Sequence, residues 1–126
     1  MTSAQRRRNF LALGDSYTIG EGVDEAQRWP AQLVARLGEH SVDVGAAEIV
    51  ATTGWTTDEL QQAIDARDFT SPYALVSLLI GVNNQYRGRD LDNYVGEFSA
   101  LLEFAVCMAG GDASRVIVIS IPDWGT

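Results

Sequence analysis

Three short polar stretches of this chain contain residues that could act together on a carbonyl group. Ser16 could supply a hydroxyl nucleophile and a backbone N–H, Gly54 a second backbone N–H, and Asn83 a side-chain amide. Donors that converge beside a hydroxyl group are what stabilises the oxyanion of a tetrahedral acyl intermediate. Each residue also has a purely structural interpretation. Ser16 could cap a helix, Gly54 could shape a turn, and Asn83-Asn84 could form an Asx turn.

The elements that must position these residues alternate between strand and helix. The helix that begins at Trp29-Pro30 is predicted to end at Gly38, and Thr56 to Glu59 reads as a capping box for the next helix. A third helix is predicted over 91–106, where apolar residues recur at helical spacing and bury one face. Buried strands are predicted at 9–13, within 42–50 with a centre at 48–51, at 73–80 and at 116–121.

Strict alternation of this kind predicts an α/β fold, a three-layer α/β/α sandwich around a parallel sheet. The third and fourth strands are almost wholly apolar, as a parallel sheet covered on both faces requires. Ligand sites in such sheets form beyond the carboxyl ends of the strands. Ser16, Gly54 and Asn83 follow the first, second and third strands, so we expect them to meet at one edge.

The three stretches together resemble the sequence blocks of the SGNH (GDSL) hydrolases. Gly14-Asp15-Ser16-Tyr17 is similar to the first block, Gly54 to the glycine of the second, and Gly81-Val82-Asn83-Asn84 to the third. The resemblance covers nearly the whole chain and implies a flavodoxin-like sheet and a serine ester hydrolase of esterase, lipase or deacetylase type. It implies Ser16 as nucleophile, with Ser16, Gly54 and Asn83 as the oxyanion hole. Gly14, Asp15 and Gly81 would support these motifs.

The sequence departs from this family in two places, the motif that supplies the catalytic base and position 84. The family's last block, Asp-x-x-His, is absent, and Asn84 stands where the family usually has Asp, which could alter how the loop is held. The one histidine, His40, follows the first long helix, so we expect an exposed loop residue at the opposite end of the sheet. We therefore expect residues 1–126 to form one SGNH-like domain that lacks its last strand and helix. The base would come from a missing carboxyl-terminal segment or a second polypeptide, and this chain alone would be inactive or very weak.

Composition excludes several other classes of function. The net charge is −8, which argues against nucleic acid as a binding partner. All nine basic residues are Arg, so a catalytic Schiff-base lysine and a phosphate-binding lysine are excluded. Arg6-Arg7-Arg8 reads as a solvated strand entry, and Cys107, the single cysteine, as a buried thiol. No signal peptide and no membrane span are recognisable, so we expect a cytoplasmic protein. We also expect no bound metal and no cofactor.

Two alternatives to a hydrolase remain open. A truncated or degenerate SGNH-like fragment that only binds would explain the missing histidine. A flavin-binding module is suggested by Thr53-Gly54-Trp55-Thr56, although that loop belongs after the first strand of a flavodoxin and here follows the second. The fourth strand would be an uncovered apolar edge that favours self-association. The candidate residues for a pocket that binds a small-molecule ester are Trp55, Tyr86 and Trp124. We expect Arg87 and Arg89 to be solvated unless they contact an anionic group of the substrate.

Overall fold

Four strands alternate with helices along the chain in the computed structural model, which describes residues 9–20, 24–42 and 44–121. Arg6-Arg7-Arg8 and Trp124 lie outside the described residues. Two short 3-10 turns accompany the regular elements, at Glu25–Gln27 and Ala113–Arg115. The strands are β1 (Phe10–Gly14), β2 (Ala47–Ala51), β3 (Leu75–Leu79) and β4 (Val116–Val118), and the helices are α2 (Ser16–Ile19), α3 (Trp29–Glu39), α4 (Thr57–Asp65), α5 (Val82–Tyr86) and α6 (Leu91–Met108).

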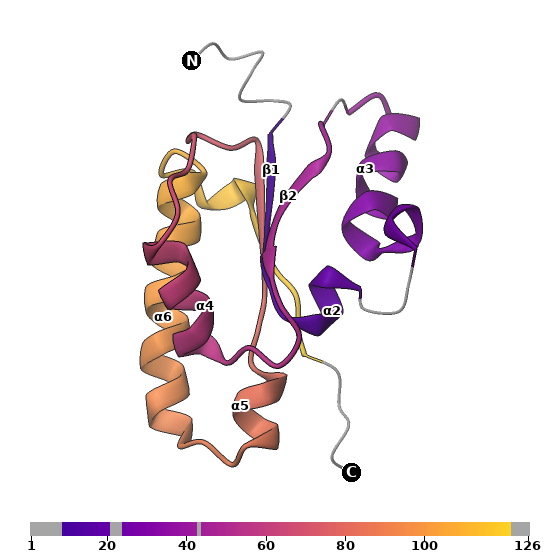
Figure 1. Cartoon of the computed structure of the whole chain (residues 1–126). Coiled ribbons are helices and arrows are strands. Elements are labelled where there is room, and N and C mark those ends of the chain that lie inside the picture. Colours follow the sequence, from indigo (N-terminus) through magenta and orange to yellow (C-terminus); the bar gives the residue numbers. More distant parts are fainter. Residues whose placement is uncertain (1–8, 21–23, 43, 122–126) are drawn as a thin grey trace.

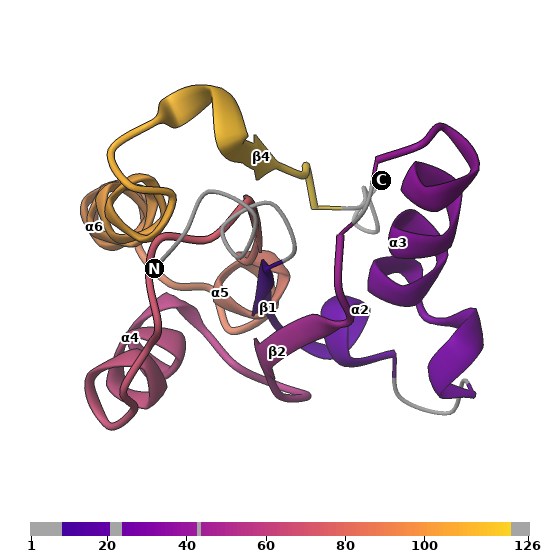
Figure 2. The same ribbon diagram turned by 90° about the horizontal axis from the view of Figure 1, so that it is seen from above.

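The strands form one parallel sheet in the order β2-β1-β3-β4. Helix α3 lies on one side of the sheet, and α4 and α6 lie on the other (Figures 1 and 2). The predicted three-layer α/β/α sandwich with a parallel sheet is thereby confirmed. β1 is central, and its last residue, Gly14, pairs with Ala51 on β2 and with Leu79 on β3.

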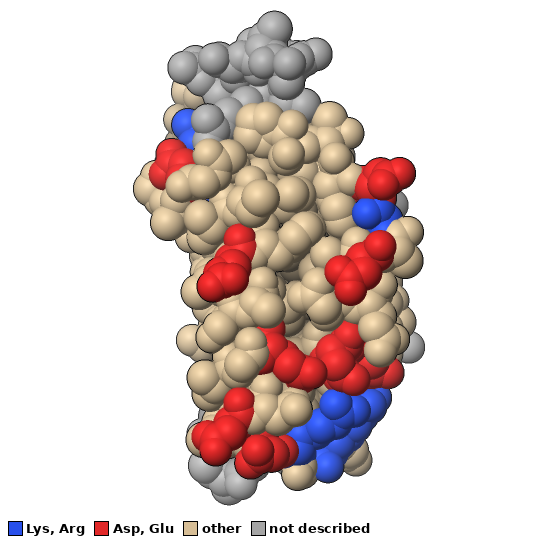
Figure 3. Space-filling model, turned by 90° about the vertical axis from the view of Figure 1, so that its left-hand side faces the viewer, with Lys and Arg blue, Asp and Glu red and all other residues tan. Residues whose placement is uncertain are grey.

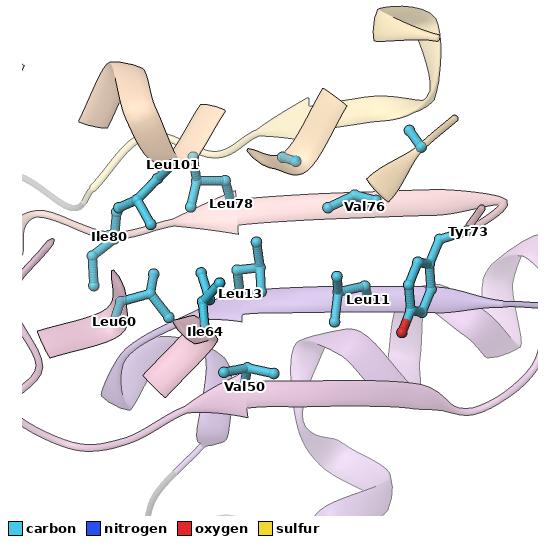
Figure 4. Packing of buried hydrophobic residues seen from close by; sticks show 12 residues of the cluster. Leu11, Leu13, Val50, Leu60, Ile64, Tyr73, Val76, Leu78, Ile80 and Leu101 are labelled. Atoms are coloured by element: carbon cyan, nitrogen blue, oxygen red, sulfur yellow. The ribbon is translucent and has the colours of Figure 1, made fainter. Parts of the chain in front are cut away.

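The central strand β1 is buried along its whole length, which explains its unbroken apolar sequence. Its side chains alternate between two cores, as successive residues of a strand must. Leu11 and Leu13 pack with Val76 and Leu78 of β3 under α4 and α6 (Figure 4). Phe10 and Ala12 face the opposite way and form a second core under α3.

Helix α4 begins where the sequence predicts, because the capping box is formed. The Thr56 N–H donates to Glu59 Oε1 at 3.0 Å, and the Thr56 side-chain oxygen accepts from the Glu59 backbone N–H. These bonds satisfy donors that the first turn of a helix leaves without an intrahelical partner. Leu60 and Ile64 then pack into the core beneath the sheet.

Helices α3 and α6 differ from their predicted form. Helix α3 continues through Gly38 to Glu39, and His40 takes the cap position. In α6, Cys107 is exposed rather than buried, because Leu101 and Ala105 supply the face that meets the core. The first turns of α6 extend beyond the carboxyl ends of the strands, which leaves residues of its predicted apolar face exposed, Leu91 and Val95 among them (Figure 1).

The predicted fourth strand is too long, since β4 ends at Val118. Its pairing with β3 continues one residue further, through the Ile119 N–H and the Leu78 carbonyl at 3.0 Å. Within the described part of the chain β4 pairs only with β3, and Ile117 and Val118 are 41% and 50% exposed. The expected uncovered apolar edge is therefore present. No helix among the described residues is both long and apolar enough to cross a membrane.

Candidate active site

Ser16 lies at the carboxyl end of the central strand, between the loops that follow β2 and β3. It is the half-buried first residue of α2, directly after the Asp15 cap. Because β1 lies between β2 and β3 in register, the loops that carry Gly54 and Asn83 leave the sheet on either side of Ser16. The three predicted donors therefore belong to one edge of the sheet.

Asp15 holds the turn that presents Ser16. Its Oδ1 accepts a hydrogen bond from the Tyr17 N–H at 3.0 Å, and its side chain is buried. Its Oδ2 is buried without a hydrogen-bond partner. Burial disfavours the charged carboxylate and raises the pKa of Asp15, against the lowering effect of the Tyr17 N–H. The conformation of this turn thus depends on a carboxyl group that has little access to solvent.

Gly54 lies in a turn just after β2, in a conformation that suits glycine. Its φ is +87°, a region that residues with a Cβ rarely adopt. Space is not the constraint, because a Cβ at Gly54 would have only Arg87 Nη2 within 4 Å, at 3.9 Å. The Gly54 carbonyl accepts a hydrogen bond from Arg87 Nη2 at 2.7 Å.

Asn83 joins the loop after β3 to the loop after β2. It lies in α5, and its Nδ2 donates to the Trp55 carbonyl at 3.0 Å. A carboxamide nitrogen carries two N–H donors, so this bond fixes the orientation of the amide and uses one of them. The second N–H is the group that could bind a developing oxyanion.

Asn84 is buried and holds the start of α4. Its Oδ1 accepts from the Thr57 N–H at 3.0 Å, and its Nδ2 donates to Thr57 Oγ1 at 2.8 Å. The Thr57 hydroxyl is therefore free to donate its own proton to Glu97 Oε1, at 2.6 Å. The asparagine supplies one acceptor and one donor, where an aspartate would supply acceptors only. This network gives a physical reason for the departure from the family pattern at position 84.

Replacing Asn84 with aspartate is expected to destabilise the fold by about 1–3 kcal/mol at neutral pH. The introduced carboxylate and that of Glu97 would then compete for the single proton of the Thr57 hydroxyl. The double variant Asn84→Asp/Glu97→Gln should recover most of the loss, because the introduced glutamine amide can donate to Thr57 Oγ1. Urea denaturation of both variants and of Glu97→Gln alone measures the coupling. Additive effects of the two substitutions would contradict the proposed network.

Two arginines near the end of α5 are exposed, as expected, and are in addition paired with acids of α4. Arg87 Nη2 lies 3.3 Å from Glu59 Oε1, and Arg89 Nη1 lies 2.9 Å from Asp58 Oδ1. The pKa of Glu59 is lowered, first by the Thr56 N–H and also by Arg87. The pKa of Asp58 is lowered mainly by the Thr56 hydroxyl, with Arg89 adding to it. In Figure 3, likewise, the blue surface of this face adjoins red acidic side chains.

The other predicted site residues take different places. The end of α3, with exposed His40, lies near the amino ends of the strands, opposite α2 (Figure 1). Trp55 packs against the core, and Tyr86 is 74% exposed. Their assignment to a substrate pocket stays a prediction.

A hollow of about 290 Å³ lies beside α5 and the start of α6. Neither Trp55 nor Tyr86 lines it. In the described part of the chain, no cluster of His, Cys, Asp and Glu could hold a metal ion. The residues that line the hollow are Gly81, Asn84, Gln85, Arg89, Leu91, Tyr94 and Ile121.

Local sequence patterns did not indicate Glu97, nor the long-range contacts that Arg87 and Thr57 make. Arg87 lies 33 positions from Gly54, and Glu97 lies 40 positions from Thr57. Contacts across such separations leave no periodic signal in a single sequence. The asparagine at position 84, where the family usually has Asp, was the one hint that the loop is held differently.

Comparison with known proteins agrees with the fold. Residues 12–125 match the model of the GDSL-like Lipase/Acylhydrolase family. Comparison with curated protein sequences gave no significant match.

Solved structures with the same fold include TesA, with a TM-score of 0.75 and 23% identity, and AlinE4, an SGNH-hydrolase family esterase, with 0.69 and 25%. The esterase EstA from Pseudoalteromonas sp. has a TM-score of 0.70 and 17% identity. Each comparison covers 94% of this chain but only 64%, 63% and 63% of TesA, AlinE4 and EstA, respectively. The chain therefore spans somewhat less than two thirds of the length of these proteins. The family match extends over most of the chain and includes all three blocks, so this chain belongs to the GDSL-like lipase/acylhydrolase family.

Proposed function

We propose that this chain carries the nucleophile and the oxyanion-binding donors of a serine ester hydrolase. Ser16 is the nucleophile, and the Ser16 N–H, the Gly54 N–H and the Asn83 amide bind the oxyanion. The observation that carries the proposal is the bond from Asn83 Nδ2 to the Trp55 carbonyl, which joins the second and third blocks beside the end of β1. Family membership supports the same assignment.

The proposed reaction is acyl transfer through Ser16. Its Oγ attacks the carbonyl carbon of an ester while its proton passes to a base, and the carbonyl electron pair moves onto the oxygen. The three donors stabilise that oxyanion. The intermediate collapses, the bond to the alcohol oxygen breaks, and the alcohol leaves with the proton from the base. Water then attacks the acyl-serine in the same way, which releases the acid and restores Ser16.

We propose further that the base is a histidine outside this chain. His40 is the one histidine of the sequence. It caps the end of α3, which lies near the amino ends of the strands, whereas Ser16 lies at their carboxyl ends (Figure 1). A serine without a positioned base is a weak nucleophile. In a serine protease, removing the base lowers turnover by about 10⁶ and leaves about 10³–10⁴ over water. We expect a penalty of that order for this chain by itself.

The exposed edge of β4 is the surface where we expect another polypeptide to bind. An uncovered apolar strand can pair with a strand of a segment that supplies the base or with a second copy of this chain. Intact mass under denaturing conditions distinguishes the two. A second polypeptide with an Asp-x-x-His sequence in the denatured sample supports the first. A single 13.7 kDa species there, with elution as a dimer in native size-exclusion chromatography, supports the second.

Covalent labelling of Ser16 tests the nucleophile without requiring full turnover. The chain is incubated with p-nitrophenyl acetate, and the acetylated protein is followed by intact mass and located by peptide mapping. We expect peptide mapping to locate an acetyl group on Ser16, distinct from any on the exposed Cys107 thiol, which the Ser16→Ala variant shares. Equal labelling of both proteins would contradict the proposal and would favour a fragment that only binds.

A further inference from the structure

The loop from Gly54 to Thr57 is held by three side chains of one short segment. Asn83 donates to the Trp55 carbonyl, Asn84 accepts from the Thr57 N–H, and Arg87 donates to the Gly54 carbonyl. All three come from α5 and the residue that ends it. The loop that carries one proposed oxyanion donor is thus attached to the helix that carries another. We propose that Arg87 is a positioning residue that fixes the Gly54 backbone, an inference that rests on the proposed function.

Gly54 requires such support because glycine restricts its own backbone least of all residues. The Gly54 N–H can serve an oxyanion only if the peptide on its amino side keeps one orientation. The hydrogen bond from Arg87, at 2.7 Å, holds the carbonyl on the other side of the same Cα. It therefore restricts rotation about ψ of Gly54, and the bond from Asn83 to the next carbonyl prevents the loop from turning as a unit.

Arg87 is an exposed residue, but its guanidinium group is also paired with an acid of α4. Its Nη2 lies 3.3 Å from Glu59 Oε1. That carboxylate oxygen also accepts from the Thr56 N–H at 3.0 Å. The guanidinium group therefore links the capping box of α4 to the Gly54 carbonyl. Both contacts are made by the same nitrogen, Nη2. A lysine side chain is one bond shorter than that of arginine, so its ammonium would reach these two oxygens less well.

The experiment compares the chain of residues 1–126 with its Arg87→Ala and Arg87→Lys variants, and uses Arg67→Ala as the matched control. Arg67 also forms an ion pair, with Glu48 at 3.2 Å on another part of the surface, but contacts none of the site residues. Backbone ¹⁵N relaxation reports the order of the Gly54 amide. Single-turnover acetylation by p-nitrophenyl acetate reports the reaction in which the acetyl group moves to Ser16 Oγ and p-nitrophenolate and a proton are released.

We expect the Gly54 order parameter to fall in Arg87→Ala from about 0.85 to below about 0.6, and to stay unchanged in Arg67→Ala. The maximal acetylation rate should fall about 10-fold in Arg87→Ala, with the ester concentration at half-maximal rate unchanged. Arg87→Lys should lie between Arg87→Ala and the wild-type chain.

The outcomes separate this inference from the proposed function. An unchanged Gly54 order parameter in Arg87→Ala overturns the positioning role, whatever the kinetics show. A mobile Gly54 with an unchanged acetylation rate overturns its catalytic consequence, while Ser16 labelling leaves the proposed function standing. Equal acetylation of the wild-type chain and Ser16→Ala refutes the proposed function and the catalytic consequence together, and the relaxation data still decide the conformational claim.

Discussion

Replacing Asn83 with alanine is expected to slow acetylation of Ser16 by about 10²–10³-fold, the usual cost of losing one side-chain donor of an oxyanion hole. The variant removes the amide that would bind the oxyanion. It also removes the bond from Nδ2 to the Trp55 carbonyl, which orients the neighbouring loop. Because the effect is on the transition state, the rate at saturating p-nitrophenyl acetate should carry most of the loss.

Asn93→Ala is the matched control for this prediction. Asn93 is an exposed residue of α6, so removing its amide should leave the acetylation rate unchanged. Far-ultraviolet circular dichroism and urea denaturation establish that both variants remain folded. A folded Asn83→Ala protein that acetylates within about twofold of the wild-type rate would exclude Asn83 from the oxyanion hole.

Replacing Gly14 with alanine is expected to destabilise the protein by roughly 1–3 kcal/mol, the typical cost of overpacking a filled site. A Cβ at this position would lie 2.2 Å from Thr18 Oγ1 and 2.7 Å from the Leu79 carbonyl oxygen. The carbonyl belongs to the neighbouring strand and cannot rotate away. We therefore expect α2, which begins with Ser16, to move away from the end of β3, so that acetylation of Ser16 slows as well.

Gly38→Ala provides a control of the same chemical size in an open position. A Cβ at Gly38 would have no neighbouring heavy atom within 4 Å, and this residue lies within α3. Alanine is the better helix former, so this variant should be more stable than the wild type by about 0.5–1 kcal/mol. Urea denaturation curves measure both changes. A Gly14→Ala protein as stable as the wild type would mean that the β1–α2 junction has room that its packing does not indicate.

The acid in the first block has a local role that the sequence only partly indicated. Asp15 caps α2 and is buried with one oxygen unpaired, so its carboxyl group has a raised pKa. A Gly-Asp-Ser motif alone does not specify this burial. It results from the packing of a four-residue helix against the end of the sheet, and a helix of that length has no periodic pattern to predict it.

The sequence by itself determined the order of the main elements, the parallel sheet and the placement of Ser16, Gly54 and Asn83 after successive strands. Continuous apolar runs, a capping box and helical spacing are local signals, and local signals are legible in one sequence. The tertiary structure alone decided that Cys107 is exposed and that Asn84 bridges Thr57 while Arg87 holds Gly54. These features depend on which helix face meets the sheet and on contacts between residues about 30 positions apart. Only the packed fold brings such residues together.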